Sequence, residues 1–374
     1  MVRSATSADY RTYASRRRGV LRGAGEQARI DAILVSRVED VRYLCGFTGE
    51  DSFLLVGGSW AALLTDGRYI EQARRECGDI EVQTRADSLA KATAELAGKH
   101  AVKRLGVQAD NVTLLMQDRL NEELKGGKTV PVRDVVGPLR AIKDAGEIKA
   151  IRKAIHVAER AFRRLLARGR KGIVGRAERD VAAELDYLMR LEGASGPAFE
   201  TIVAAGAHGS RPHYRPGSAR IRPGQPVLID WGAKVDGYCS DLTRVIFTGT
   251  IPRKLAEIYG VALRAQAAAI RAVRPGVTCR SVDAAAREAV RQAGYADKFL
   301  HGLGHGVGLA VHEAPALAAK CGNRLRAGMV VTVEPGIYLP GVGGVRIEDD
   351  ILVTRRGRQK LSTLPTPLKA MTLA

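Results

Sequence analysis

Short apolar runs alternate with helix-like segments along the first 140 residues. Each run is brief, rich in aliphatic residues and bounded by turn residues, which predicts buried strands. These runs are residues 32–35, 52–56, 61–64 and 104–107. Residues 69–77 and 88–101 have helical composition. The alternation predicts an α/β domain, which we place at residues 26–140.

Beyond residue 145 the apolar positions recur at steps of three and four, which is typical of a helix with one buried face. These positions are Ile148, Ile151, Ile155, Ala158, Phe162 and Leu165. Gly137 and Pro138 interrupt the chain just before the helix, so we predict a linker over residues 136–144. We expect a second domain over residues 145–360 and a C-terminal tail over residues 361–374.

The second half contains an internal repeat with an offset of 104 residues. The string RPGQPVLIDWG, which starts at Arg222, aligns with RAGMVVTVEPG, which starts at Arg326. Upstream residues match at the same offset: Gly172, Arg176 and Glu184 with Gly276, Arg280 and Glu288. Two matches at one offset indicate two helix-then-strand halves related by duplication. The repeat places Asp230 and Glu334 at equivalent points and predicts a site between the halves.

In each half, the repeated strand is followed by a turn and by a second strand that carries another acidic residue. After Asp230, the dipeptide Asp236-Gly237 is a strong hairpin signal. A four-residue loop would place Asp230 opposite Asp241. A two-residue loop would place it opposite Thr243, with Asp241 as the diagonal neighbour on the same face. With either loop the two carboxylates converge.

The other half repeats this arrangement with two glutamates. After Glu334 a bend over residues 339–343 leads back to Glu348, and a five-residue loop would pair these two residues. Four carboxylates on facing hairpins would repel one another unless they are protonated or neutralised. Two divalent cations would balance their charge, and the glycine-rich segment 301–313 adds imidazole groups nearby. The sequence therefore predicts a metal site.

Composition and charge add little to this interpretation. Hydrophobic residues make up 45% of the chain and charged residues 26%, which excludes a disordered or collagen-like protein. The net charge of +19 raises the possibility of a nucleic-acid partner, but residues 1–30 and 351–374 each hold +5 of it. No nucleic-acid-binding motif accompanies the charge, so we expect no such partner. We interpret residues 1–25 as a loose basic N-terminal arm.

The cysteines and the hydrophobicity bear on location. Five cysteines are scattered without a C-x-x-C pair, which predicts neither a disulfide framework nor a thiolate zinc site. A reducing compartment fits best, and we expect a cytoplasmic protein. No apolar run reaches transmembrane length, so no membrane association is expected.

At the acidic positions the sequence resembles the pita-bread metallopeptidases, the family of methionine aminopeptidase, aminopeptidase P and prolidase. The matching strings are LIDWG, SDLTR, GLGHGVG, TVEPG and VRIED. The first half is similar to a creatinase-type N-terminal domain in YLCGFTG, from Tyr43, and LTDGRY, from Leu64. Simple methionine aminopeptidases lack that domain, so the resemblance favours the proline-specific branch. It implies a creatinase-type N-terminal α/β domain followed by a duplicated α+β pita-bread catalytic domain.

The resemblance also implies a ligand set. Asp230 would chelate one metal ion, Asp241 and Glu348 would bridge both ions, and His305 and Glu334 would hold the second. Glu334 would also act as the general base. Oxygen-rich ligation favours two Mn or Co ions, with Zn or Fe as alternatives.

Further residues match positions around the family's substrate. His213 and His312 are expected to stabilise the oxyanion or protonate the leaving amine. His301, Arg346 and Tyr338 are expected to bind substrate, although Arg346 could instead orient a ligand carboxylate and His301 could be an ordinary loop histidine. The hydroxyl groups expected to support the ligands are those of Thr243 and Thr332. His208 and Trp231 have no assignment beyond a structural role.

These expectations converge on a dinuclear metal-dependent exopeptidase that hydrolyses the bond between an N-terminal residue and proline, as an Xaa-Pro aminopeptidase or Xaa-Pro dipeptidase. Its substrate would be a peptide with proline at the second position, and we expect a homodimer. Two alternatives remain: a non-hydrolytic relative that binds nucleic acid or protein, and a creatinase-type amidinohydrolase. Both would have less need of the five ligands, and all five are present.

Overall fold

The computed structural model describes residues 7–373 and divides the chain into two compact units. The boundary falls between Arg140 and Ala141, inside the stretch where the sequence predicts a linker. No helix among the described residues is long and apolar enough to cross a membrane.

The N-terminal unit is built on one six-stranded sheet with the order β4-β3-β2-β1-β5-β6. Its strands are β1 (Ala32–Val35), β2 (Phe53–Gly57), β3 (Ala61–Thr65), β4 (Glu81–Thr84), β5 (Arg104–Gln108) and β6 (Lys128–Val132). The β1–β2 and β2–β3 pairs are antiparallel, and the other pairs are parallel. The four predicted strands are confirmed to within a residue at each end.

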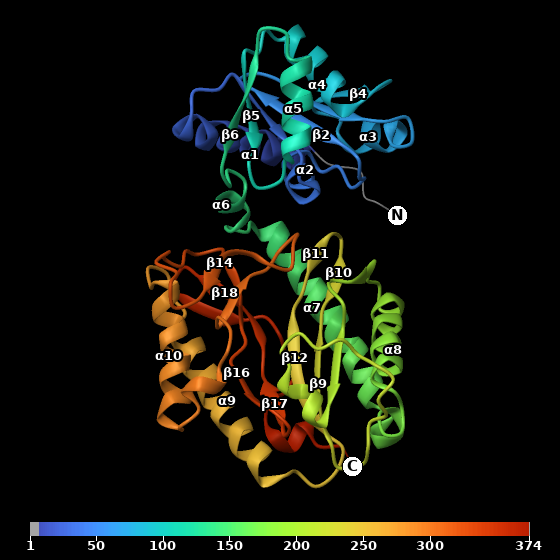
Figure 1. Ribbon diagram of the computed structural model, residues 1–374, viewed down its shortest axis with the longest axis vertical. Coiled ribbons are helices and arrows are strands. Elements are labelled where there is room, and N and C mark those ends of the chain that lie inside the picture. The colour runs from blue at the N-terminus through green and yellow to red at the C-terminus, as the bar shows by residue number, and fades with distance from the viewer. Residues whose placement is uncertain (1–6, 374) are drawn as a thin grey trace. The chain divides into compact units, whose positions relative to one another are not determined.

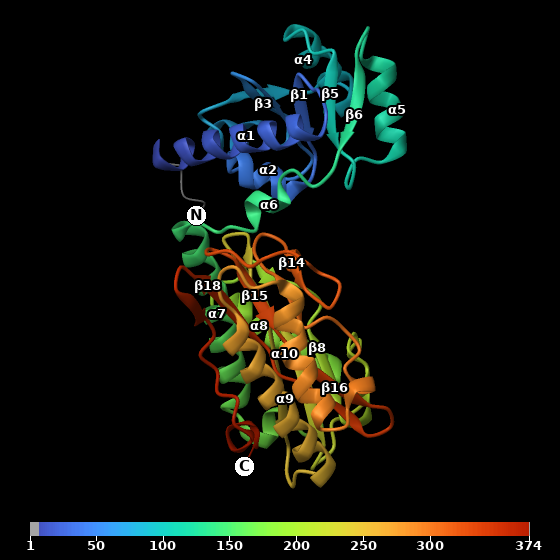
Figure 2. The same ribbon diagram turned by 90° about the vertical axis from the view of Figure 1, so that its left-hand side faces the viewer.

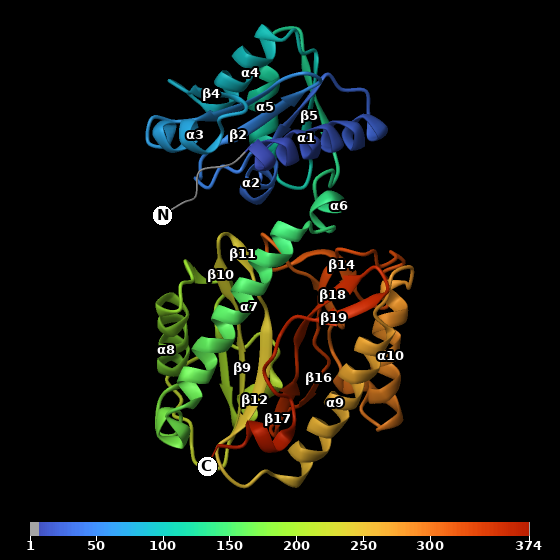
Figure 3. The same ribbon diagram turned by 180° about the vertical axis from the view of Figure 1, so that it is seen from behind.

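Six helices lie in the described part of this unit, from residue 7 onward. They are α1 (Ser7–Gln27), α2 (Val38–Cys45), α3 (Ile70–Glu76), α4 (Leu89–Lys99), α5 (Leu114–Glu123) and α6 (Gly137–Arg140). Alternate side chains of β1, such as Leu34, join a core with α4 and α5, while α1 lies on the opposite face of the sheet (Figures 1 and 3). The two helices predicted from composition are therefore confirmed as α3 and α4.

The prediction of a loose basic arm over residues 1–25 is wrong for the part of it that the structure describes. Residues from Ser7 onward form α1, and Val20 and Ala24 on this helix are fully buried. Arg17 donates a hydrogen bond to the carbonyl oxygen of Leu44 and pairs with Asp79 at 2.6 Å. Arg17 thus anchors the helix through buried contacts, which the charge count does not reveal.

The C-terminal unit begins with its first helix-and-strand half. The elements are α7 (Ala145–Leu166), η1 (Gly169–Gly172), α8 (Glu178–Leu191), β7 (Gly196–Pro197), β8 (Ile202–Ala205), η2 (Gly206–Ser210), β9 (Pro226–Trp231), β10 (Ala233–Val235), β11 (Tyr238–Cys239) and β12 (Leu242–Phe247). A capping box between Asp144 and Glu147 starts α7, whose apolar face is buried as the spacing predicts. Strands β8, β9 and β12 form an antiparallel sheet.

The second half repeats this order. Its elements are α9 (Arg253–Ala272), α10 (Cys279–Gln292), η3 (Ala296–Lys298), β13 (Gly304–Gly306), β14 (Glu313–Leu317), β15 (Val330–Val333), β16 (Gly336–Leu339), β17 (Gly343–Arg346), β18 (Asp349–Thr354), β19 (Gly357–Lys360) and η4 (Leu368–Met371). Strands β9 and β15 begin at Pro226 and Val330, which are 104 residues apart, so the duplication is confirmed.

Within this unit the two halves face each other across the strands. Helices α7 and α8 lie on one side of the strands and α9 and α10 on the other, and Figure 2 shows α9 and α10 side by side on their face (Figures 1–3). One large apolar core fills the space between the helices and the strands. The acidic hairpins therefore stand in the middle of the unit.

The segment predicted as a C-terminal tail is part of this unit as far as Leu373. Leu361, Leu364 and Met371 are buried. The backbone amide of Leu373 donates a hydrogen bond to the carbonyl oxygen of Phe247, on β12. The segment consequently packs against the strands that carry the acidic residues.

Candidate active site

The first hairpin has the shorter of the two loops that the sequence allows. Val235 pairs with Tyr238, so the loop consists of Asp236 and Gly237, whose φ values are 49° and 79°. Positive φ at both positions defines the primed turn that this dipeptide favours. The same register continues into β9 and β12, where Asp230 lies opposite Thr243. The two-residue alternative is therefore confirmed, and Asp241 is the diagonal neighbour of Asp230.

The second hairpin has the predicted register but a shorter loop. Val333 pairs with Asp349 on one side and Gly336 with Arg346 on the other. Both pairs share one register, and that register places Glu334 opposite Glu348, as predicted. The five-residue loop is wrong, because Leu339 pairs with Gly343 and only three residues remain between them.

The structure brings most of the predicted site residues together around one cavity of about 440 Å³. Of the twelve, nine line this cavity: Asp230, Asp241, His213, His301, His305, His312, Glu334, Arg346 and Glu348. The remaining three, Thr243, Thr332 and Tyr338, are buried behind its wall and hydrogen bond to residues that line it. The sequence repeat, the hairpins and the glycine-rich segment thus meet at one place.

The lining residues present the donor atoms of a divalent metal site. Asp241, His305 and Glu348 each offer a ligand atom, and these atoms lie within 4.8 Å of one another. Nε2 of His305 is 3.6 Å from Oδ2 of Asp241 and 3.4 Å from Oε1 of Glu334. Oδ1 of Asp230 is buried and has no hydrogen-bond partner among the described residues. An oxygen in this state is suited to bind a cation, since buried polar atoms normally have partners.

Two threonines and an arginine hold the carboxylates in place. Oγ1 of Thr243 donates a hydrogen bond to Glu348 at 2.7 Å, and Oγ1 of Thr332 donates to Glu334 at 3.1 Å. Nη2 of Arg346 lies 2.5 Å from Oδ2 of Asp230. Arg346 therefore holds the carboxylate of Asp230, a predicted metal ligand, while it also lines the cavity.

The acidic residues carry strongly perturbed pKa values. Burial, followed by repulsion from Glu348, raises the pKa of Asp241 well above its ordinary value. Burial, followed by repulsion from Glu334, does the same to the pKa of Glu348. Burial raises the pKa of Glu334 to about 7. A divalent cation would relieve both the repulsion and the loss of solvent, so the electrostatics of the cavity fit metal binding.

The orientation of His305 also fits a metal ligand. Burial, together with the neighbouring His312, lowers the pKa of His305 to about 4, so its ring is neutral at pH 7. Its Nδ1 is 3.0 Å from the carbonyl oxygen of Gly306, which can only accept a hydrogen bond. The proton therefore lies on Nδ1, and the lone pair of Nε2 points to Asp241 and Glu334.

Two residues without an assignment in the sequence have structural roles, as expected. The indole N–H of Trp231 donates to the carbonyl oxygen of Ala158, and its ring stacks on Phe162. Nδ1 of His208 lies 2.8 Å from Oε1 of the buried Glu178. The hydroxyl of Tyr214, which lines the cavity, donates to the same carboxylate.

The sequence reasoning missed several residues near the site. Asp350 is fully buried, accepts a hydrogen bond from the amide of Asp241 and has one unpaired oxygen among the described residues. Its only sequence signal is its position two residues after Glu348. Apolar side chains that line the cavity carried no signal at all: Phe199, Ile202, Pro212 and Val311.

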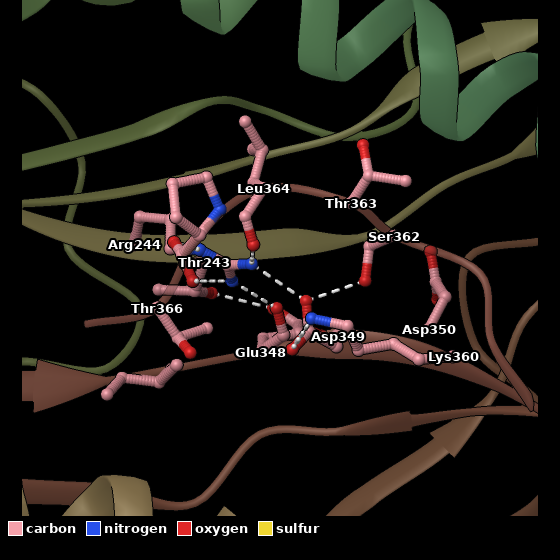
Figure 4. Close-up of polar contacts among 12 residues, drawn as sticks. Thr243, Arg244, Glu348, Asp349, Asp350, Lys360, Ser362, Thr363, Leu364 and Thr366 are labelled. Carbon is pink, nitrogen blue, oxygen red and sulfur yellow. Dashed lines mark hydrogen bonds and ion pairs between the residues drawn. The ribbon is translucent and has the colours of Figure 1, made fainter. Parts of the chain in front are cut away.

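A buried polar network lies beneath the ligands (Figure 4). The side chain of Arg244 is fully buried and pairs with Asp349 at 2.7 Å. Its guanidinium also donates to the carbonyl oxygens of Thr243 and Glu348. Ser362, from the C-terminal segment, donates to Asp349 at 2.6 Å. The network thus joins the strands of both halves directly behind the candidate metal ligands.

This combination of a duplicated fold with an acidic cavity containing a neutral histidine defines a metallohydrolase of the pita-bread type. Two family models match the chain: Metallopeptidase family M24 over residues 149–355 and Creatinase/Prolidase N-terminal domain over residues 17–142. The chain belongs to metallopeptidase family M24. It is accordingly a hydrolase that uses divalent metal ions to cleave peptides. The predicted fold, a creatinase-type N-terminal domain followed by a pita-bread domain, is confirmed.

Several relatives are similar over nearly their whole length. The chain is 39% identical to the uncharacterized peptidase YqhT of Bacillus subtilis, over 93% of this chain and 98% of that protein. It is 38% identical to an Xaa-Pro dipeptidase of Pyrococcus horikoshii, over 89% of this chain and 93% of that one. Among solved structures, an Xaa-Pro dipeptidase from Bacillus anthracis matches with a TM-score of 0.92 at 36% identity, covering 96% of this chain and 100% of that chain.

Proposed function

We propose that this protein hydrolyses the bond between an N-terminal residue and proline, as an Xaa-Pro dipeptidase or Xaa-Pro aminopeptidase. One observation carries the proposal: five donor residues line a single cavity in a chain that matches proteins named Xaa-Pro dipeptidase over nearly its whole length. The donors are Asp230, Asp241, His305, Glu334 and Glu348.

Two divalent ions, which we propose to be Mn or Co, would bind these donors. Asp230, Asp241, His305, Glu334 and Glu348 would together hold the two ions. When bound, such ions lower the pKa of water and polarise a carbonyl group. Oxygen donors predominate in the set, which supports Mn or Co, with Fe and Zn as the alternatives.

Glu334 has the properties of a general base. Its carboxylate lines the cavity, with Oε1 3.4 Å from Nε2 of His305, so it can accept a proton from water there and pass it to the leaving nitrogen. The neutral hydroxyl of Thr332 donates a hydrogen bond to Oε1 of Glu334 and so fixes the orientation of the carboxylate. The reaction needs this proton transfer because the nitrogen of a proline leaving group departs only after it is protonated.

Neutral imidazoles are suited to the developing oxyanion. Burial lowers the pKa of His312, so its ring is uncharged near pH 7 and can donate one N–H. We also assign oxyanion stabilisation or protonation of the leaving amine to His213, which lines the same cavity, and substrate binding to His301, Arg346 and Tyr338. Thr243 and Thr332 act through the carboxylates that they hydrogen bond.

The cavity also offers an apolar wall next to the polar groups. Phe199, Ile202 and Val311 line it beside the donors. Proline has an apolar ring and no backbone N–H. A site for proline therefore needs apolar contacts with the ring and no acceptor for a backbone N–H. This wall supports proline at the second position of the substrate.

The test is hydrolysis by purified protein that has been stripped with a chelator and reloaded with Mn, Co or Zn. We expect cleavage of Xaa-Pro dipeptides or Xaa-Pro-Xaa peptides, and little cleavage of matched Xaa-Ala peptides. Asp241→Asn serves as the control for contaminating peptidases. Failure to cleave with every metal, together with tight and salt-sensitive RNA binding or with hydrolysis of creatine, would favour one of the two alternatives instead.

We further propose a cytoplasmic homodimer. All five cysteines, which lie within the described residues, are free thiols, which supports a reducing compartment. Light scattering coupled to size-exclusion chromatography measures the mass in solution, and a monomeric mass would contradict the dimer. Cell fractionation tests the location.

A further inference from the structure

An ion pair on α10, with a buried carboxylate and a partly exposed guanidinium, faces the segment that leads into the glycine-rich strand β13. Asp283 and Arg287 are one helical turn apart, and Nε of Arg287 lies 2.7 Å from Oδ2 of Asp283. The Asp283 side chain is 1% exposed and that of Arg287 is 34% exposed. The carboxylate of the pair is therefore shielded from solvent. Neither side chain lines the cavity of the candidate metal site.

This pair holds three backbone groups of the segment 299–303. Arg287 donates to the carbonyl oxygens of Phe299, at 3.2 Å, and His301, at 2.5 Å. Oδ1 of Asp283 accepts a hydrogen bond from the amide of Leu303 at 3.1 Å. The guanidinium also lies 4.4 Å from the centre of the Phe299 ring. The two side chains thus hydrogen bond to the backbone of every second residue of this segment, namely Phe299, His301 and Leu303.

The held segment carries His301 into the cavity. Nε2 of His301 is 2.8 Å from the hydroxyl oxygen of Tyr338, and Nδ1 is 4.0 Å from Oε2 of Glu334. Residues 299–303 form no helix or strand. One further backbone bond, from the amide of Glu334 to the carbonyl oxygen of Leu303, ties its end. The position of His301 therefore depends mainly on side-chain contacts from α10 and not on a sheet ladder.

We propose that Arg287, held by Asp283, is a positioning residue that sets His301 for substrate binding. The inference rests on the proposed function, because it assigns His301 to the substrate. Arg287 touches neither a metal ligand side chain nor the cavity of the site. Its effect should consequently appear in substrate affinity and not in metal affinity.

The chain offers a matched control on the same helix. Arg291 lies one turn beyond Arg287, is 63% exposed and pairs with Glu288 instead of the loop. We would compare Arg287→Met, which keeps the apolar stem, with Arg287→Lys and Arg291→Met. The expected result for Arg287→Met is a rise in KM of about tenfold with little change in kcat or in calorimetric metal affinity. Arg287→Lys should recover part of the loss, and Arg291→Met should match the parent.

A double-mutant cycle separates positioning from general damage. If Arg287 acts through His301, Arg287→Met should change KM by less than about twofold in a His301→Ala background. An unchanged tenfold effect in that background, an equal loss in metal affinity, or the same effect from Arg291→Met would overturn the proposal.

A spectroscopic measurement keeps the inference independent of catalysis. In the zinc-loaded protein, which is diamagnetic, the ring C–H signals of His301 report its surroundings by NMR. Arg287→Met should shift these signals while Arg291→Met leaves them in place; an unmoved signal would refute the positioning role. If the signals shift but the parent protein cleaves no Xaa-Pro substrate, the proposed function fails while the positioning of His301 stands.

Discussion

Removing the metal should reverse the usual dependence of stability on pH. Burial raises the folded-state pKa of Glu334 from 4.5 to about 7, and burial with repulsion raises those of Asp241 and Glu348 well above their ordinary values. The metal-free native state therefore binds these protons more tightly than the unfolded chain does. The resulting stabilisation is complete at low pH and is lost as the pH rises through the folded-state pKa values. We expect the metal-free protein to become less stable from pH 6.5 to 8.5.

The size of the effect can be bounded from Glu334 alone. At about 1.36 kcal/mol per pKa unit, its shift corresponds to about 3 kcal/mol over the whole titration. About 1 kcal/mol of this falls between pH 6.5 and 8.5. Asp241 and Glu348 add to the loss in the same direction. The buried His301 and His305 oppose this loss by about 0.4 kcal/mol each, because their pKa values rise from about 4 in the folded state to 6.5 in the unfolded chain, so the comparison with Glu334→Gln is needed to isolate the contribution of Glu334.

Urea unfolding, followed by circular dichroism at several pH values, measures this dependence. The parent protein is compared with Glu334→Gln, and each is studied with chelator and with saturating Mn. The variant should lose about 1 kcal/mol less than the parent over this range. Bound metal should stabilise more as the pH rises, because the ligands must be deprotonated. A metal-free stability that is flat or rises with pH, or an equal slope in Glu334→Gln, would refute the electrostatic reasoning.

Other predictions concern single contacts. Arg244→Met should cost about 3–5 kcal/mol in urea unfolding because it leaves Asp349 buried without its partner, and adding Asp349→Leu should recover part of this loss. Thr243→Val should lower metal affinity about 10–100-fold by calorimetry, since it removes the hydroxyl that orients a ligand carboxylate. Gly237→Ala should cost about 1–2 kcal/mol in unfolding at its φ of 79°. Glu334→Gln should retain some metal by elemental analysis but lose turnover, and an active variant would contradict the assigned base.

The sequence could locate the acidic hairpins but could not choose the first loop. Both loop lengths keep Asp230 and Asp241 on one face, so the hydrophobic pattern is satisfied by either. The choice depends on the backbone at Asp236, whose φ of 49° is a property of the folded turn. In the second hairpin the predicted register is correct, whereas Leu339 and Gly343 form one more ladder pair than the predicted five-residue loop allows.

Contacts between distant parts of the chain were beyond sequence reasoning. Seven arginines against two acidic residues in the first 30 positions indicated a solvated arm. The carboxylate of Asp79 and the carbonyl of Leu44, which bind Arg17, lie 62 and 27 residues away along the chain. Asp350 was missed for a similar reason, because only the fold places it against the amide of Asp241.

The duplication explains where two of the carboxylates stand, and its imperfections explain their chemistry. Asp230 lies within β9, which continues to Trp231. Glu334 is followed by Pro335 and lies just beyond β15, which ends at Val333. Proline has no N–H for a ladder, so Glu334 stands at a strand end while Asp230 stays within one. Arg346 is hydrogen bonded to Asp230 at 2.5 Å but lies 4.0 Å from Glu334. Its charge therefore opposes the effect of burial more strongly at Asp230 than at Glu334, so in the metal-free protein burial still raises the pKa of Glu334 to about 7.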